Sequence, residues 1–176
     1  MKKYHTVIVD NVFENPQNVV NLSKEYKFYP PKLNEEGHGW SGLRTDNLYY
    51  LNVDLFRFIV HKAMSFYFSN TNEIDFFATA YFHKNIPTKK EKNLTIHKDD
   101  VVKIAGVVYL NEGNDIKTGT SIYDDNNNES IIVSNKFNSM ICYDANTNHG
   151  PSNLDENRLT IPFFIHSINK NNMEYI

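Results

Sequence analysis

From residue 74 to residue 168 the chain is a succession of short apolar segments separated by polar turns, and this pattern constrains the fold more than any other feature. Short runs rich in β-branched and aromatic residues, bounded by Gly, Asn, Asp and Ser, are typical of β-strands. The pattern predicts strands over residues 75–83, 94–98, 102–110, 119–123, 130–133, 138–143, 147–150 and 158–166. The turn-rich segments between them include 84–93, 111–118 and 124–129.

The part of the chain before residue 74 has a different pattern. Residues 6–9 predict one strand, and Asn15 followed by Pro16 indicates the start of a helix that extends to about residue 27. Apolar residues at helical spacing predict a second, amphipathic helix over 53–68. A long polar loop at 32–47 separates the two helices, and long loops of this kind are often functional.

Short strands behind two helices predict the fold class. About eight such strands are typical of a mainly β (α+β) fold, the double-stranded β-helix or jelly roll, with the two N-terminal helices packed on one face. We expect a single domain over residues 1–176. Residues 1–73 would form the helical support and loop, and residues 74–168 the jelly-roll core.

Composition excludes several classes of protein. Hydrophobic residues make up 40% of the chain and aromatic residues 14%, which excludes a disordered chain. A net charge of −3 gives no overall attraction to nucleic acid or to an anionic membrane, and no apolar stretch approaches the length of a membrane span. Cys142, the only cysteine, rules out an intrachain disulfide and a thiolate zinc cluster and is expected in the core. With no signal peptide at Met1, we expect a cytoplasmic location (the host cytoplasm if the protein is encoded by a phage).

Three residues have the types needed for a metal site. His97 and Asp99 lie two positions apart in the strand predicted over 94–98, so their side chains are expected on one face, with Asp100 on the other. His149 follows about four strands later, enough chain for a jelly roll to return beside its start. Two imidazoles and a carboxylate form the facial triad that leaves positions open on ferrous iron. The alternative is a chance His-x-Asp and an ordinary turn histidine.

Arg158 begins the strand predicted over 158–166 and shares a face with Thr160 and Phe164. A guanidinium inside a barrel is costly when unpaired, so its position predicts an anionic partner. A surface arginine at a strand start is the alternative. Pro162 lies in the same strand and cannot donate to a ladder, so a bulge or an edge position is expected there.

Tyr109 ends the strong strand that begins at Ile104, on the same face as Ala105 and Val107. Its phenol is suited to donate to the carboxylate that Arg158 would hold. The small Ala105 and Gly106 are expected to leave room for a ligand.

Together these residues resemble the 2-oxoglutarate/Fe(II)-dependent dioxygenase superfamily, and specifically its prolyl-hydroxylase-like branch. The resemblance covers roughly residues 75–166 and consists of the following motifs: His-x-Asp at 97–99, Tyr-Leu-Asn at 109–111, Gly-Thr at 119–120, His149 and Arg158. The N-terminal pattern, Asp10 to Pro16 with Trp40 to Arg44, is similar to small oxygenase-like proteins of phages and marine bacteria.

The resemblance implies a ligand set and a reaction. Fe(II) would be bound by His97, Asp99 and His149, which are then the catalytic residues. The co-substrate 2-oxoglutarate would place its C5 carboxylate on Arg158 and Tyr109. Further co-substrate contacts would come from Thr160 and, as a weaker assignment, Tyr81. Dioxygen would then serve to hydroxylate a C–H bond of a peptidyl residue or a small molecule, with release of succinate and CO2.

The prime substrate and the oligomeric state stay open at this stage. Loops 32–50 and 84–93 are expected to flank the mouth of the site, because function concentrates on loops held by a rigid scaffold. Trp40 and Arg44 are the candidate substrate residues on the first loop. Trp40 can equally cap the core, and Arg44 can pair with a structural carboxylate. A peptidyl side chain, a free amino acid and a nucleic-acid base each fit, and the branch resemblance weakly favours prolyl hydroxylation.

Two other functions compete with this one. The first is a non-catalytic jelly-roll module, for binding or structure, that retains the metal site. The second is a cupin-type metal enzyme without 2-oxoglutarate, which would need additional histidine ligands and gives Arg158 no role. His83 and His166 are its candidates.

Overall fold

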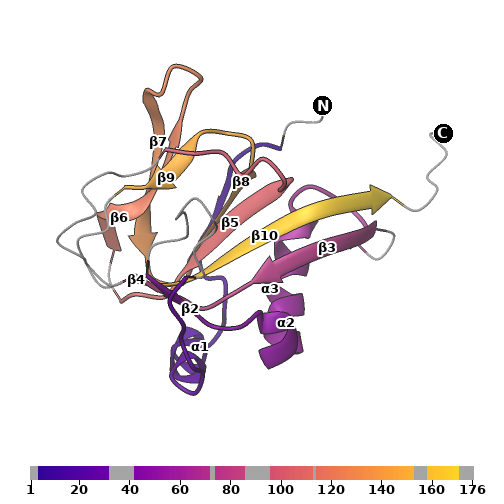
Figure 1. Ribbon diagram of the computed structural model, residues 1–176, viewed down its shortest axis with the longest axis vertical. Helices are drawn as coiled ribbons and strands as arrows, with labels where there is room; N and C mark the ends of the chain where they lie inside the picture. The colour runs from indigo at the N-terminus through magenta and orange to yellow at the C-terminus, as the bar shows by residue number, and fades with distance from the viewer. Residues whose placement is uncertain are drawn as a thin grey trace.

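The computed structural model describes residues 4–31, 42–71, 74–85, 96–112, 114–152 and 158–170. Two antiparallel sheets face each other as a jelly roll, and the helices lie on the outer face of the larger sheet (Figure 1). The larger sheet has the strand order β1-β8-β5-β10-β4-β2, with β3 paired to the outer half of β10. Its strands are β1 (Val7–Val9), β2 (Leu43–Arg44), β3 (Ile74–Ala80), β4 (His83–Asn85), β5 (Ile104–Tyr109), β8 (Ser139–Asp144) and β10 (Arg158–Lys170).

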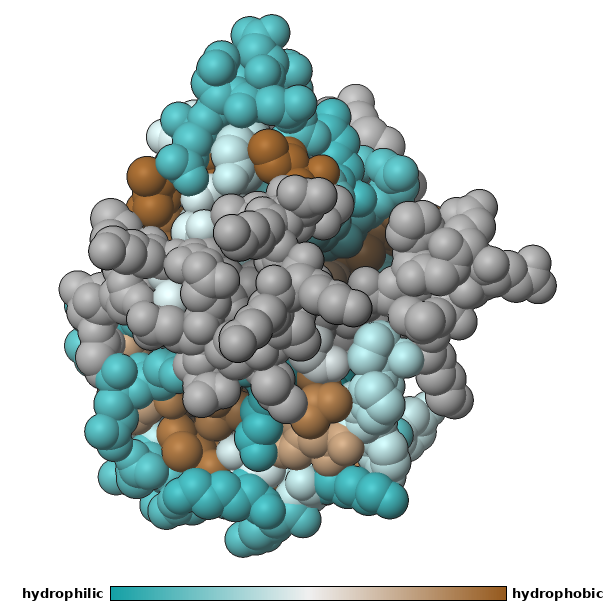
Figure 2. Space-filling view, turned by 60° about the vertical axis from the view of Figure 1, so that its left-hand side comes forward, coloured by the Kyte–Doolittle hydropathy of each residue, from teal (hydrophilic) through white to brown (hydrophobic). Residues whose placement is uncertain are grey.

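The smaller sheet has the order β7-β6-β9 and forms the other wall of the jelly roll. Its strands are β6 (Asn114–Tyr123), β7 (Glu129–Lys136) and β9 (His149–Pro151). The β6–β7 hairpin projects from the body, and its tip is hydrophilic (Figure 2). At this tip the Asp124 carboxylate accepts hydrogen bonds from the backbone N–H groups of Asn126 and Asn128, at 2.8 Å each. These bonds fix the turn that the polar run at 124–129 predicted.

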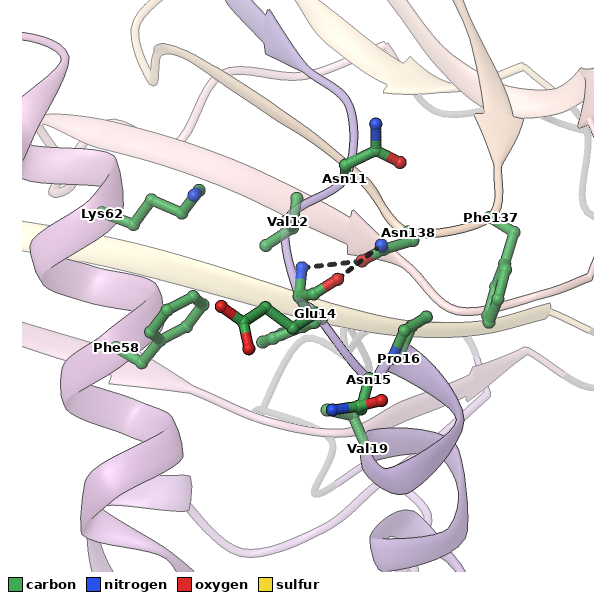
Figure 3. A pocket seen from close by; sticks show the side chains of 11 residues that line it. Asn11, Val12, Glu14, Asn15, Pro16, Val19, Phe58, Lys62, Phe137 and Asn138 are labelled. Carbon is green, nitrogen blue, oxygen red and sulfur yellow. Dashed lines mark hydrogen bonds between the residues drawn. The ribbon is translucent and has the colours of Figure 1, made fainter.

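Three helices precede the jelly roll: α1 (Pro16–Ser23), α2 (Leu48–Leu51) and α3 (Val53–Ser65). The first segment of chain is tied to the turn between β7 and β8, because the Asn138 side chain both accepts from and donates to the Phe13 backbone at 2.9 Å (Figure 3). Asn138 adopts a φ of 61°, a left-handed conformation that asparagine tolerates better than most residues. A groove lies beside this tie, between residues 11–16 and α3.

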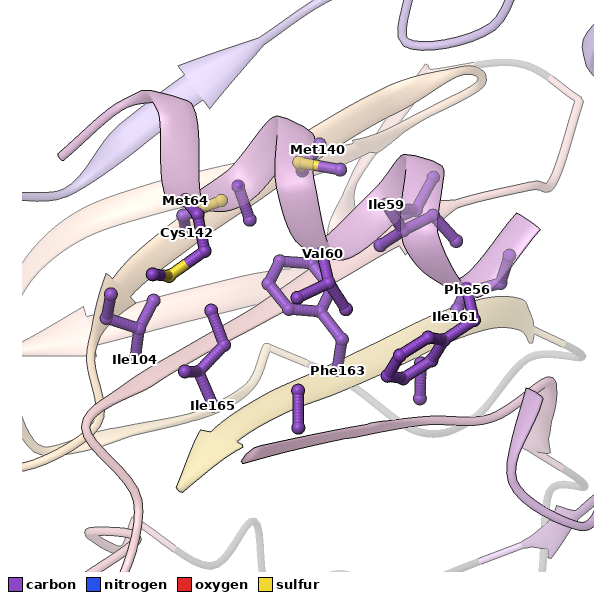
Figure 4. Close-up of a cluster of buried hydrophobic side chains, with 14 of the residues drawn as sticks. Phe56, Ile59, Val60, Met64, Ile104, Met140, Cys142, Ile161, Phe163 and Ile165 are labelled. Atoms are coloured by element: carbon purple, nitrogen blue, oxygen red, sulfur yellow. The ribbon is translucent and has the colours of Figure 1, made fainter. Parts of the chain in front are cut away.

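The outer face of the larger sheet and α3 share one core, which we call the helix-side core. Figure 4 shows Val60 and Met64 of α3 directed at the apolar side chains of the strands. The helix-side core comprises Val12, Leu48, Phe56, Ile59, Val60, Ala63, Met64, Phe68, Ile74, Ala78, Ala80, Phe82, Ile104, Val108, Leu110, Met140, Cys142, Ile161, Phe163 and Ile165. The expected helical layer on one face is therefore confirmed, with α1 packed at its margin through partly buried residues such as Val19.

A second core, the interior core, fills the space between the two sheets. It comprises Val102, Ala105, Tyr109, Ile122, Val133, Ile141, Tyr143 and Ala145. Because side chains alternate along a strand, the residues of β5 and β8 that are absent from the helix-side core face the interior. The expected grouping of Tyr109 with Ala105 and Val107 is confirmed, since Val107 packs against this core.

Several predicted boundaries were wrong. The first helix ends at Ser23, where the Ser23 hydroxyl donates to the Val20 carbonyl at 2.7 Å, and the second ends at Ser65. The expected loop at 32–47 contains the short strand β2, and the side chain of Asn47 then caps α2. The Ser23 and Asn47 side-chain hydrogen bonds are local, whereas β2 forms by pairing with the distant strand β4, and apolar periodicity reveals neither.

The predicted strands also changed in number and length. The strand expected over 75–83 is divided into β3 and β4, β6 begins at Asn114 rather than 119, and β10 extends to Lys170. Pro162 pairs with Val107 of β5, and on its other side its carbonyl accepts from Tyr81 in the gap between β3 and β4. The N and C=O of one strand residue point the same way, so the Pro162 nitrogen, which carries no hydrogen, faces the gap between β3 and β4. No ladder hydrogen bond is lost there, and the gap accommodates the proline as an edge position would.

Among the residues that the structure describes, no helix combines the length and the hydropathy needed to cross a bilayer.

Candidate active site

The segment around His97 does not form the predicted strand over 94–98, of which residues 94 and 95 lie outside the described residues. His97 makes an isolated antiparallel bridge with His149, in which each backbone N–H donates to the other's carbonyl at 3.0 and 2.9 Å. Asp99 N–H donates to the Ala145 carbonyl at 2.9 Å. Pairing between two distant segments, rather than alternation along one strand, therefore brings His97 and Asp99 together with His149.

The three side chains form one cluster. A ligand atom from each of His97, Asp99 and His149 lies within 4.8 Å of the others. His149 Nε2 is 3.5 Å from Asp99 Oδ2, and His97 Nε2 is 3.8 Å from Asp99 Oδ1. The exposed fraction of the side chain rises from 5% for His149 to 21% for Asp99 and 45% for His97, so the cluster is open on the His97 side. Asp100 is exposed in the following turn and takes no part.

The orientation of the His149 ring suits metal binding. Its Nδ1 lies 2.8 Å from the Thr147 carbonyl oxygen, and because a carbonyl only accepts, Nδ1 carries the proton. The lone pair of a neutral ring is then on Nε2, the atom that faces Asp99. Outer hydrogen bonds of this kind fix the tautomer and the orientation of metal-binding histidines.

Asp99 has an unmet requirement that a cation would satisfy. Its Oδ2 is buried and makes no hydrogen bond within the described part of the chain. Burial raises the pKa of Asp99, but His149, His97 and Arg44 together hold that pKa below its ordinary value, so the carboxylate is charged at neutral pH. Two imidazole nitrogens and a charged carboxylate with a free lone pair fit a divalent transition-metal ion, and Fe(II) is the usual ion for this ligand set with open positions.

Arg158 lies deeper, in the interior between the two sheets. It is 9% exposed, and its Nη1 donates to the Gly119 carbonyl at 3.1 Å. Its Nε is buried without a hydrogen-bond partner, and no carboxylate of the described residues forms an ion pair with it. Burial lowers the pKa of Arg158, while Tyr109 and Tyr143 counteract this effect. The expected buried guanidinium is present, and its missing partner must be an anionic ligand if its charge is to be compensated.

Two further predicted residues lie beside Arg158. The Arg158 guanidinium lies 5.4 Å from the centre of the fully buried Tyr109 ring, and the Tyr109 hydroxyl donates to Thr120 Oγ1 at 2.6 Å. Thr160 is 5% exposed and pairs with Tyr109 across β10 and β5. The expectation for Gly106 was wrong: a Cβ there would clash with the Phe163 ring, so Gly106 makes room for the helix-side core and not for a ligand.

The candidate substrate residues are placed differently. Arg44 lies in β2 with its guanidinium over the rings of Tyr81 and Phe164, at 5.6 and 5.7 Å. Burial lowers the pKa of Arg44 to about 10, and both Tyr81 and Asp99 act against this shift, which places Arg44 within electrostatic reach of the cluster. The Tyr81 side chain, predicted as a weak co-substrate contact, lies against the Arg44 guanidinium. Trp40 lies outside the described residues.

Other candidates do not join the cluster. His83 accepts from Arg44 Nε at 3.4 Å, and His166 lies 3.1 Å from Thr79 Oγ1. Within the described residues the potential metal-binding group is His97, Asp99 and His149 alone, so the extra histidine ligands of a cupin-type site are not found there. The groove beside α3 in Figure 3 is lined by none of the predicted site residues, so it is separate from the candidate active site.

Tyr143 lies beside the cluster, and the sequence interpretation did not single it out. It lies in β8 on the interior face, and its ring centre is 4.7 Å from that of His149. The run around Cys142 was interpreted only as an apolar strand. Its position six residues before His149, on the face opposite Cys142, was the available signal.

Comparisons with known proteins agree at the level of the fold. No protein-family model matches the sequence, and no curated protein matches it. A prolyl-4-hydroxylase from Pseudomonas putida is similar over 93% of this chain and 94% of its own, with 11% identity and a TM-score of 0.63. A Trichoplax adhaerens prolyl hydroxylase, in complex with a hypoxia inducible factor peptide, is similar over 92% and 83%, with 12% identity and a TM-score of 0.64.

A third structure widens the range of chemistry on this fold. A non-heme α-ketoglutarate-dependent epimerase from nogalamycin biosynthesis is similar over 92% of this chain and 78% of its own, with 14% identity and a TM-score of 0.57. The fold that the resemblance implies is thus confirmed: the chain has the same jelly roll as these solved 2-oxoglutarate/Fe(II) oxygenases and prolyl hydroxylases. At these identities the likeness concerns the fold, and function has to be argued from the site.

Proposed function

We propose that this protein is an Fe(II)- and 2-oxoglutarate-dependent dioxygenase of the hydroxylase type. The observation that carries the proposal is the pairing of two unmet requirements in one jelly roll. At the open end, Asp99 Oδ2 lacks a partner beside two histidines, which favours a cation. Inside, Arg158 lacks a carboxylate, which favours an anion. A metal-chelating dicarboxylate satisfies both.

His97, Asp99 and His149 would hold the ferrous ion. The bound ion, with 2-oxoglutarate and dioxygen, would supply the oxidising chemistry, in which the co-substrate is converted to succinate and CO2. The contribution of the protein is geometry. The His97–His149 backbone bridge and the Thr147 carbonyl hold the two imidazoles before any metal arrives, which reduces the reorganisation that binding requires.

Arg158, Tyr109 and Thr160 would hold the distal carboxylate of 2-oxoglutarate. A guanidinium offers two parallel N–H donors to a carboxylate, and in a buried position such a pair is stronger than at a surface. Tyr109 can redirect its hydroxyl from Thr120 to the ligand. The interior core around these groups excludes water from the co-substrate. Tyr81 is kept as a weaker co-substrate contact.

The prime substrate would be a peptidyl residue or a small molecule. Arg44 supports this assignment, because its cation lies within electrostatic reach of Asp99 and between two aromatic rings, where it can orient a polar group of the substrate. A peptide is favoured to the extent that the Trichoplax adhaerens neighbour is in complex with one. Trp40 is kept as a substrate residue by the sequence argument alone.

The test begins without oxygen. Fe(II) and 2-oxoglutarate added to the protein should give the weak visible charge-transfer band of the chelated complex, and succinate should form when air enters. Asp99→Ala should lose iron. Arg158→Ala should retain iron but lose 2-oxoglutarate. The control Arg57→Ala changes an exposed arginine of α3 and should retain both iron and 2-oxoglutarate.

Three results would count against the proposal. A wild-type protein that binds iron but shows no band with 2-oxoglutarate would refute the dioxygenase function. Full retention of iron by Asp99→Ala would refute the ligand set. A band without succinate, over a range of peptide and small-molecule substrates, would favour the non-catalytic module.

A further inference from the structure

Tyr143 lies between the two parts of the site. Its backbone pairs with Ala105 in the middle of the larger sheet, and its side chain belongs to the interior core. On one side its ring contacts His149, with the ring centres 4.7 Å apart and the planes at 54°. On the other side the interior core continues to Tyr109, beneath the Arg158 guanidinium.

Electrostatics place the Tyr143 hydroxyl within reach of both ends. Burial raises the pKa of Tyr143 well above its ordinary value, Asp99 and Tyr109 raise it further, and Arg158 lowers it. Among the described groups with shifted pKa values, Tyr143 is the one whose pKa is changed both by Asp99 of the cluster and by Arg158. Because the Tyr143 ring lies against His149 and shares the interior core with Tyr109, which is under Arg158, a ligand that extends from the cluster to Arg158 would pass beside the Tyr143 side chain.

The hydroxyl has no role in holding the protein together. The Tyr143 side chain is 4% exposed, and its hydroxyl makes no hydrogen bond to any residue that the structure describes. The hydroxyl is not one of the buried atoms that lack a partner (these are on Asp99, Asn135 and Arg158), so it borders space that water or a ligand can occupy. Tyrosine in such a position packs through its ring and keeps its hydroxyl available to a polar partner. Packing against His149 needs only the ring. The hydroxyl is therefore accounted for by a ligand and not by the fold.

We propose that Tyr143 is a further co-substrate-binding residue, whose hydroxyl donates a hydrogen bond to the 2-oxo acid at the end that faces His149. This inference rests on the proposed function. It adds a hydrogen-bond donor in the interior between the two sheets, beyond the Arg158 and Tyr109 contacts with the distal carboxylate. Its ring also packs against His149, so the two roles have to be separated by experiment.

The variant Tyr143→Phe separates them, because it keeps the ring and removes the donor. Binding of 2-oxoglutarate is measured by calorimetry on the Mn(II)-loaded protein, and Mn(II) affinity is measured separately. We expect the Kd for 2-oxoglutarate to rise about tenfold, as for the loss of a hydrogen bond to a charged ligand, with Mn(II) affinity unchanged. The melting temperature without ligands should not fall, since the hydroxyl has no partner in the protein.

Tyr67→Phe is the matched control. It removes a phenol hydroxyl that donates to the His5 carbonyl at 2.9 Å, away from the site, and should bind both ligands like the wild type. Equal 2-oxoglutarate binding by Tyr143→Phe and the wild type would overturn the inference and leave Tyr143 as packing. A parallel loss of Mn(II) affinity would overturn it too, because Tyr143 would then act through His149. If the wild-type protein itself binds no 2-oxoglutarate, the proposed function is wrong. The wild-type measurement shows this without reference to the Tyr143→Phe variant.

Discussion

The two faces of the larger sheet differ in what they leave unsatisfied. Strands β5, β8 and β10 contribute alternate residues to both faces, so the same backbone serves two cores. On the helix-side face the contributions are mostly apolar, for example Ile104, Cys142 and Phe163, each 0% exposed. The buried Asp144 of β8 also lies on this face, where its carboxylate accepts a hydrogen bond from the Tyr4 backbone N–H at 2.9 Å. On the interior face the same strands contribute Tyr109 and Arg158.

The difference shows where stability and binding are located. Among the described residues, the helix-side face leaves no buried side-chain atom without a hydrogen-bond partner, so it can be packed to the density of a protein interior and contributes mainly to stability. The interior holds buried polar atoms without partners, on Arg158 and on Asn135, and Asp99 at its mouth has another. Buried polar groups are nearly always paired, so such atoms mark places where a ligand completes the structure.

The largest effect is expected on the helix-side face. Phe163→Ala should lower the free energy of unfolding by about 3–5 kcal/mol, because it leaves a cavity opposite Gly106 in a fully buried position. Denaturant unfolding measures the change. The control Phe77→Ala, on a side chain of the same sheet that is 60% exposed, should cost much less. Equal losses for the two variants would show that the helix-side core is not the stabilising one.

The next effect tests how apolar the helix-side face is. Cys142→Ser should cost about 1–3 kcal/mol, because it buries a hydroxyl that has no partner. Cys142→Ala, which adds no polar group, should cost less than Cys142→Ser. Since burial also raises the pKa of the Cys142 thiol, a thiol reagent should label the native protein only as fast as it unfolds. Rapid labelling of the native protein would contradict the assigned burial.

A smaller effect of opposite sign is expected on the interior face. Arg158→Met should raise the free energy of unfolding of the ligand-free protein by about 1 kcal/mol, because an apolar side chain replaces a buried, uncompensated cation. The same variant should lose 2-oxoglutarate binding. Thermal unfolding with and without 2-oxoglutarate measures both changes. A destabilisation as large as that of Phe163→Ala would mean that Arg158 is structural, and the contrast between the two faces would fail.

The smallest effect concerns His166, at the bulge in β10 outside both cores. Burial lowers the pKa of His166 from 6.5, and Asp99 only partly opposes this. The folded state therefore favours the neutral ring, the unfolded state binds more protons, and stability is lost as the pH falls below 6.5 towards the folded pKa. His166→Asn, which keeps a partner for Thr79, should show less of this loss than the wild type. Identical pH profiles would assign the loss to other groups.

Much of the jelly roll follows from local pattern. Side-chain alternation along a strand is a property of the backbone, so the sequence alone predicted that Arg158 shares a face with Thr160, and Tyr109 with Ala105. It also predicted the types of most elements, because apolar periodicity persists over several residues. Element ends were less certain, as in α1, because single side-chain hydrogen bonds decide them.

The grouping of the three candidate metal ligands was predicted for a partly wrong reason. The residue types and their order indicated His97, Asp99 and His149, but the expected strand at 94–98 is replaced by a backbone bridge between His97 and His149. Such a bridge joins residues far apart in the chain, and no local pattern records it. Whether the assigned ligands bind iron stays a prediction.

The sequence by itself determined which residues of a strand share a face. Only the tertiary structure decided which face is the helix-side core and which is the interior. When both faces of a central strand are buried, their apolar patterns look alike, so Gly106 was assigned to a ligand and Tyr143 was given no role. The choice depends on whether α3 or the smaller sheet covers that face, and that is settled by the packing of segments distant in the chain.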